Sequence, residues 1–309
     1  MRGPGRATCV AAVLTALLAL PATANAKIDA TDVSAAKVRE RSFTPAGVEP
    51  VGGSVKCPKG NRVLSGGAFW HQGSNRSPVK PPATSFPTLS ASIPTFDGRG
   101  WYAHGTSSQA ETLTIRILCT RAGHLEDYLA LSSTFLPDDG DPVGGSEECD
   151  PGTVAFTGGS SWALGLGQES PADADRGLLA SNAISEDGRA WYSDGLDVWV
   201  GQAPDLHIVR AIRCLPNKQL AKTVIRTQSA PAAQGAEAAA KARCSDRQRA
   251  LAGGAVWHTG DGEPNLFTNA GISGGSSAAT KDLRGWYAHG YNADSGGFRT
   301  LTVQVLCLK

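Results

Sequence analysis

The sequence predicts an all-β protein of three tandem antiparallel units, each a β-sandwich or a small barrel. One pattern occurs three times: a Cys, eight residues, Gly-Gly, two residues and Trp, followed about 25 residues later by Asp-x-Arg-(Gly/Ala)-Trp-Tyr and then a closing Cys. Its copies begin at Cys57, Cys149 and Cys244, and this near-constant step indicates a tandem array. The 37 Gly and 18 Pro supply turns, and no long helical period follows the first 26 residues.

The amino-terminal segment, residues 1–26, has the features of a secretory signal. Arg2 and Arg6 precede an apolar run, and Ala24-Asn25-Ala26 offers a small-residue cleavage site. The mature chain is therefore expected outside the cytoplasm, and no later stretch is apolar enough for a membrane helix. Its charge is nearly balanced, which argues against nucleic acid or an anionic membrane surface as the main partner.

Six cysteines remain after removal of the signal, two in each copy of the pattern. An even count with a repeated spacing predicts disulfides in an oxidising compartment. Because a duplicated unit is expected to close on itself, we predict the pairs Cys57 with Cys119, Cys149 with Cys214, and Cys244 with Cys307. Each bridge closes a loop worth roughly 4 kcal/mol in the chain-entropy model. Clustered cysteines typical of a metal site do not occur, so the cysteines are not expected to hold a metal, and no cofactor is expected.

The closing strand of each copy shows the clearest alternation. Leu113, Ile115 and Ile117 share one face with the closing cysteine in the first copy, as expected for a half-buried strand. The middle copy places Arg210 on that face. Two explanations are open: a bulge that turns Arg210 away, or a polar interior in this unit.

Each Gly-Gly pair lies inside a predicted strand, for example within residues 62–70. Glycine weakens a strand unless a ring or another backbone must approach closely, so a Trp ring is expected over the pair. Asp97-Gly98 and Asp187-Gly188 predict tight hairpin turns, whereas Asp282-Leu283 requires another turn type. The recurring Asp-x-Arg predicts a local ion pair across each turn.

Short strand-like stretches precede each copy, at 38–43, 129–135 and 224–228, and extend the units. The expected units are 34–121, 128–215 and 222–309. In the third unit, residues 229–241 contain Pro231 and Gly235, which predicts a loop with at most a short helix. Separate beads and a closed pseudo-three-fold assembly both remain open.

With its early Cys, Gly-Gly strand, Trp strand and closing Cys, the chain resembles repeat units of secreted actinobacterial proteins whose function is unassigned. The residues that carry the resemblance are Cys57, Gly66, Gly67, Trp101 and Cys119 with their counterparts. The resemblance implies a fold and no activity.

The repeated Trp residues are expected to fill the cores, whereas Tyr102, pointing opposite to Trp101, is expected to be exposed. Units 1 and 3 have histidine at two equivalent positions, where the middle unit has Ala163 and Asp194. If neighbouring strands carry them, His71 could meet His104, and His258 could meet His289, around a ligand or a metal. The candidate ligand-binding residues are His71, Tyr102, His104, His258, Tyr287 and His289.

Residues 271–275 match the Gly-x-Ser-x-Gly nucleophile elbow, but that motif must join a strand to a helix, so a chance match is expected. No catalytic constellation occurs in all three copies. The sequence therefore favours a secreted, non-catalytic binding or structural protein whose partner is a cell-wall glycan or another secreted protein. The alternative is an extracellular hydrolase with a site between units near the histidine pairs.

Overall fold

The computed structural model describes residues 27–73, 87–109, 111–121, 127–135, 143–164, 177–197, 206–258, 272–293 and 297–309. Six strands fall in each expected unit. Unit 1 contains β1 (Lys37–Phe43), β2 (Val51–Lys56), β3 (Asn61–His71), β4 (Thr88–Pro94), β5 (Gly100–Thr106) and β6 (Thr112–Arg121). Unit 2 contains β7 (Tyr128–Phe135), β8 (Val143–Glu148), β9 (Thr153–Leu164), β10 (Gly177–Ile184), β11 (Ala190–Asp197) and β12 (Leu206–Pro216). Unit 3 contains β13 (Thr223–Ala232), β14 (Ala236–Arg243), β15 (Arg249–His258), β16 (Ile272–Ala279), β17 (Gly285–Asn292) and β18 (Arg299–Leu308).

These strands form three six-stranded antiparallel sheets, so the all-β fold predicted for the chain is confirmed. Sheet 1 has the order β1-β6-β3-β16-β17-β14, sheet 2 has β2-β5-β4-β9-β12-β7, and sheet 3 has β13-β18-β15-β10-β11-β8. Every sheet therefore joins three strands of one unit to three strands of another. Within one unit, the two groups of three strands belong to different sheets and face each other across the core.

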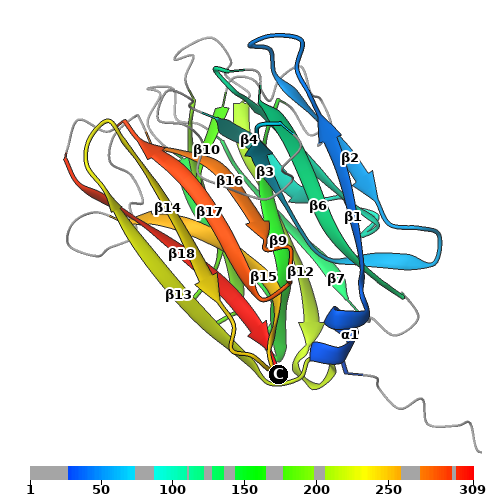
Figure 1. Cartoon of the computed structure of the whole chain (residues 1–309). Helices are drawn as coiled ribbons and strands as arrows, with labels where there is room; N and C mark the ends of the chain where they lie inside the picture. Colours follow the sequence, from blue (N-terminus) through cyan, green and yellow to red (C-terminus); the bar gives the residue numbers. More distant parts are fainter. Residues whose placement is uncertain are drawn as a thin grey trace, which may run out of the picture.

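This sharing of sheets closes the three units into a ring. Strand β3 pairs with β16 of unit 3, β9 with β4 of unit 1, and β15 with β10 of unit 2. Strands β4, β10 and β16 also contact one another, which places them around a common axis. In Figure 1 the strands run side by side along the molecule, and α1 (Ala30–Ala35) lies near the end that carries the carboxyl terminus. Of the two arrangements left open by the sequence, the structure has the closed pseudo-three-fold one.

The Gly-Gly pairs occupy the positions where this arrangement is tightest. A Cβ atom on Gly66 would lie 2.4 Å from the Trp101 ring of the same unit, and Gly158 and Gly253 stand in the same way under Trp191 and Trp286. The second glycine faces another unit: a Cβ on Gly67 would lie 2.3 Å from the Ser277 carbonyl oxygen. The expected ring over the pair is thus the later Trp of the repeat, and it covers only the first glycine.

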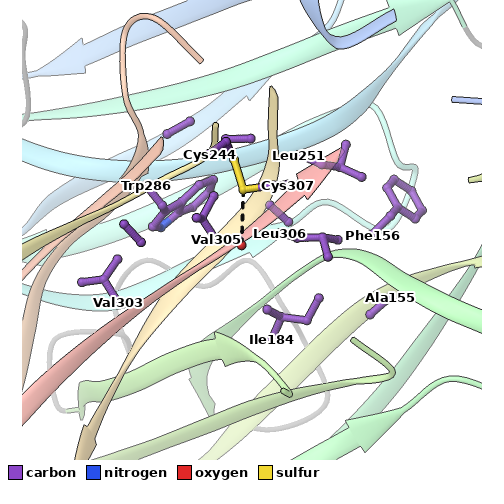
Figure 2. Close-up of a cluster of buried hydrophobic side chains, with 14 of the residues drawn as sticks. Ala155, Phe156, Ile184, Cys244, Leu251, Trp286, Val303, Val305, Leu306 and Cys307 are labelled. Carbon is purple, nitrogen blue, oxygen red and sulfur yellow. Dashed lines mark hydrogen bonds between the residues drawn. A yellow bond between two sulfur atoms is a disulfide. The ribbon is translucent and has the colours of Figure 1, made fainter. Parts of the chain in front are cut away.

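The face of each sheet that carries these Trp rings, here called the inner face, holds the cores. The six recurring Trp residues are at most 3% exposed, which confirms their core assignment. The predicted disulfides are all present, with Cα–Cα separations of 5.6, 5.8 and 5.5 Å for the first, second and third units. Figure 2 shows the third of these bridges beside Trp286, with Phe156 and Ile184 of unit 2 in the same buried cluster.

One end of the ring is closed by apolar residues that the three units contribute together. Leu64, Phe156 and Leu251 are fully buried in one cluster, which also includes Val33 of α1. That helix begins with a capping box between Asp29 and Asp32, and it packs against β6 and β15. The units therefore share a core near α1 in addition to sharing sheets.

The turns before β5, β11 and β17 contain the same side-chain-to-backbone hydrogen bond. Gly98 and Gly188 have positive φ angles of 65° and 72°, and the third unit reaches φ 54° with Leu283. In each turn the Asp carboxylate accepts the backbone N–H of the following Arg, as Asp97 does from Arg99 at 2.9 Å. The direct contact of each Asp with its Arg is thus a side-chain-to-backbone hydrogen bond, and Lys56 is a further ionic neighbour of Asp97 at 3.8 Å.

Two further expectations are settled by the strands of units 2 and 3. The segment read as a loop or short helix forms β13 and β14, because pairing with β18 and β17 outweighs the helix propensity of its alanines. Pro231 is tolerated there because β13 is the edge strand of sheet 3. Arg210 keeps its inward direction, 1% exposed, and donates to the Ser193 carbonyl oxygen at 3.2 Å, so the interior of unit 2 is polar.

Two glycine substitutions test the packing. Gly66→Ala is expected to destabilise by roughly 1 to 3 kcal/mol because its methyl group overlaps the Trp101 ring, and Gly67→Ala by a similar amount because it pushes unit 3 away. Gly47→Ala is the control, since nothing lies within 4 Å of its added Cβ. Thermal unfolding of the three variants measures the effect. Unchanged melting of Gly67→Ala would contradict the contact between units.

Candidate functional site

His71 and His104 lie on opposite sides of unit 1. His71 ends β3 in sheet 1 and His104 lies on β5 in sheet 2, and both side chains point away from the core between these sheets. Each imidazole has its own hydroxyl partner: His71 Nε2 lies 2.8 Å from Thr114 Oγ1, and His104 Nδ1 lies 3.0 Å from Ser90 Oγ. The structure does not bring this expected pair together.

The histidines of unit 3 are divided in the same way. His258 ends β15 in sheet 3, whereas His289 lies on β17 in sheet 1. His289 Nε2 is 3.6 Å from Glu237 Oε1, and both side chains are almost completely buried. The outer face of sheet 1, opposite its inner face, therefore carries His71 of one unit and His289 of another.

The expected exposure of Tyr102 is wrong. Tyr102 and Tyr287 are 5% and 8% exposed, although they do point opposite to the neighbouring Trp residues. The outer faces are buried because each sheet passes from one unit to the next: Tyr102 packs in a cluster with Ile93 of its own unit and Ala211 of unit 2. Tyr102 is therefore a contact between units.

The second histidine position of the repeat holds a buried titratable group in all three units: His104, Asp194 and His289. Each lies beside the strand at the ring axis. Ser90 and Ser181, on β4 and β10, hydrogen-bond to His104 and Asp194, respectively. Ser181 Oγ also accepts the Trp257 backbone N–H of unit 3 at 3.2 Å, and Ser276 Oγ accepts that of Trp70 in unit 1 at the same distance. Ser181 and Ser276 thus form hydrogen bonds between one unit and the next.

Burial determines how these groups titrate. It lowers the pKa of His104 to about 4, so the imidazole is neutral near pH 7. Burial raises the pKa of Asp194 to about 6, against weaker opposing hydrogen bonds from Ser181 and Tyr192. In turn, burial and then the charge of Asp194 raise the pKa of Tyr192, whose hydroxyl donates to Asp194 Oδ2 at 3.0 Å.

The contact of Glu237 with His289 was not expected from the sequence. Glu237 lies on β14, and burial followed by the charge of Glu237 raises the pKa of Tyr287 on the adjacent strand β17. Because β14 falls within the segment expected to be a loop, no periodicity assigned Glu237 to a sheet face. Ser90 and Ser181 were missed as well, because they are not at equivalent positions of the repeat: Ser181 pairs with Asp194, whereas Ser90 lies in the irregularity between Leu89 and Ala91.

The space among these groups is small. A cavity of about 20 Å³ lies where the units meet, lined by Leu89, Leu179, Ser276, Ser277 and His289 among others, and it has room for roughly one water molecule. Within the described part of the chain, no three His, Cys, Asp or Glu side chains gather closely enough to hold a metal ion.

The elbow-like sequence forms no strand-to-helix turn. Residues from Ile272 onward belong to β16, which pairs with β17, whereas Gly271 lies outside the described residues. Strand geometry here agrees with a chance match to the motif.

Comparison with models of known protein families gives no match, and a search of curated proteins finds no significant relative. Among the described residues, no helix has the length and apolar content needed to cross a membrane.

Opposite pH dependences are expected for two substitutions. The Asp194 carboxyl ionises near pH 4 when unfolded and near pH 6 when folded, so it lowers folding stability as the pH rises through this window. The stability of Asp194→Asn relative to the parent should therefore increase by up to about 3 kcal/mol between pH 4 and 7. The stability of His104→Gln relative to the parent should instead increase as the pH falls from 6.5 to 4, because the buried imidazole of the folded parent stays neutral over this range.

Urea unfolding at several pH values measures both differences. Parallel stability profiles for Asp194→Asn and the parent protein would contradict the raised pKa of Asp194. The two substitutions act as controls for each other, because a general effect of acid on the fold would change the relative stability of both variants in the same direction.

Proposed function

We propose that this protein is a secreted, non-catalytic binding or structural component of the extracellular or cell-envelope environment. Three disulfides brace a closed ring, a construction suited to an oxidising compartment. The partner we propose is a cell-wall glycan or another secreted protein.

One observation carries the non-catalytic part of this proposal: three of the four candidate histidines each contact a different partner instead of one another. His71 and His104 contact hydroxyl groups on different sheets, and His289 faces Glu237 in a third environment. A hydrolytic site would need an acid and a base that converge on one cleft. The frame residues, by contrast, recur in every unit: the Gly-Gly pair, the two Trp residues and the disulfide.

A sedimentation assay separates binding from hydrolysis. The mature protein is incubated with insoluble cell envelope, and both the bound protein and the soluble fragments released are measured. We expect binding without release, and equal binding by His71→Asn and His104→Asn, whose amides can retain the hydroxyl contacts. Release of fragments that either substitution abolishes would support the hydrolase alternative, and absence of binding would refute the binding role.

A further inference from the structure

Charge is divided unevenly among the three units, although the whole chain is nearly neutral. Residues 34–121 contain eleven Lys and Arg against four Asp and Glu, a net charge of +7. Residues 128–215 contain four basic and fourteen acidic residues, a net charge of −10, and residues 222–309 carry ten and six, a net charge of +4. Because the units share one frame, this difference is not required by the fold.

The basic residues of unit 1 include a strip along a sheet edge. Lys37, Arg39 and Arg41 alternate along β1, the edge strand of sheet 1, and all three are exposed. Alternate residues point to the same side of a strand and lie about 7 Å apart. The three cations, here called the cationic strip, therefore form a row about 13 Å long.

The acidic residue of β1 is kept away from this row. Glu40 points to the other side of the strand, where its Oε1 accepts a hydrogen bond from Arg116 Nε at 2.5 Å. Arg116 is itself buried, lies over the Phe69 ring and donates to the Ala279 carbonyl oxygen. The negative charge of Glu40 is thus neutralised on the outer face, and the cationic strip retains its positive potential.

One end of the strip is held in place. The Arg41 guanidinium lies 4.8 Å from the centre of the Phe43 ring and donates to the Ser54 carbonyl oxygen of β2 at 3.4 Å. Figure 1 shows β1 and β2 side by side at this corner, and the two strands are in contact. A guanidinium fixed in this way loses less side-chain entropy when it binds an anion.

The equivalent strands lack such a row. At the matching positions unit 2 has Tyr128, Ala130 and Ser132 on β7, and unit 3 has Val224, Arg226 and Gln228 on β13. Three exposed like charges on one strand also repel each other, so they do not serve the stability of unit 1.

We propose that the cationic strip is a docking surface for a linear polyanion whose phosphate or carboxylate groups can meet cations spaced about 7 Å apart. This inference specifies the ligand class of the proposed binding function and rests on it. Lys37, Arg39 and Arg41 would each meet one anionic group. The acidic unit 2 would repel the same polymer, which favours its binding on unit 1.

A second copy of this chain is the rival occupant, because unit 2 is acidic. Its exposed acidic residues among those described lie near turns, as Glu148, Asp150 and Glu186 do, and they do not form a row along one strand that could match the strip. A single-stranded nucleic acid has suitable charges, but the strip offers no free aromatic ring for base stacking, since Arg41 covers Phe43.

Binding of two labelled polymers tests the proposal: inorganic polyphosphate as the phosphate probe and polygalacturonate as the carboxylate probe. The strip variant is Lys37→Gln, Arg39→Gln, Arg41→Gln. The control variant, Lys222→Gln, Arg247→Gln, Lys281→Gln, removes the same charge from exposed positions of unit 3. Matching thermal unfolding of the three proteins shows that each is folded.

We expect the strip variant to bind at least one polymer about ten-fold or more weakly, with a salt dependence reduced by about two charges, while the control variant binds nearly as the parent does. Whichever polymer binds identifies phosphate or carboxylate as the recognised group. Equal losses in the two variants, or no binding of either polymer by the parent, would overturn the proposal.

Two further outcomes would also overturn it. Tighter binding of single-stranded DNA of matched length would assign the strip to nucleic acid, and association in sedimentation velocity that only the strip variant loses would assign it to a second copy. The envelope assay separates this proposal from the function on which it rests. Envelope binding that the strip variant retains refutes the strip alone, whereas polymer binding without envelope binding refutes the proposed location.

Discussion

The double contact made by each Gly-Gly pair is the constraint on which the rest of the structure depends. The first glycine leaves room for a Trp ring inside one unit, and the second leaves room for the backbone of another unit. Neither position has space for a Cβ, so a side chain there would force apart either the core or the ring. Because the two glycines are consecutive in one strand, packing inside a unit and closure between units cannot be separated.

Ring closure accounts for the burial of the outer faces and for the chemistry found there. Tyr102 would face solvent on an isolated unit, but the shared sheet places it against Ala211 of unit 2. Buried polar atoms require partners: Ser90 Oγ is the partner of His104, and the Glu237 carboxylate lies beside His289. Exposed side chains that differ among the units lie at the sheet edges, as those of β1 do.

The sequence predicted the strands, the disulfides and the buried Trp residues, because each follows from spacing within one repeat. It could not predict which strands become neighbours, since a period of two identifies the face of a strand and not its partner. The pairing of His71 with His104 failed for that reason: residues of one repeat were assumed to share one sheet. Residues 229–241 failed because alanine content favours a helix while strand pairing decides the outcome. The charge division among the units is present in the sequence and disappears when only the total is considered.

Differential scanning calorimetry of residues 27–309 tests most directly whether the three units form one closed structure. Since every sheet contains strands of two units, the loss of one unit removes half of two sheets. The account predicts a single transition whose van't Hoff enthalpy equals the calorimetric enthalpy. Separate transitions, or a van't Hoff enthalpy near one third of the calorimetric value, would show that the units unfold independently and would contradict the closed ring.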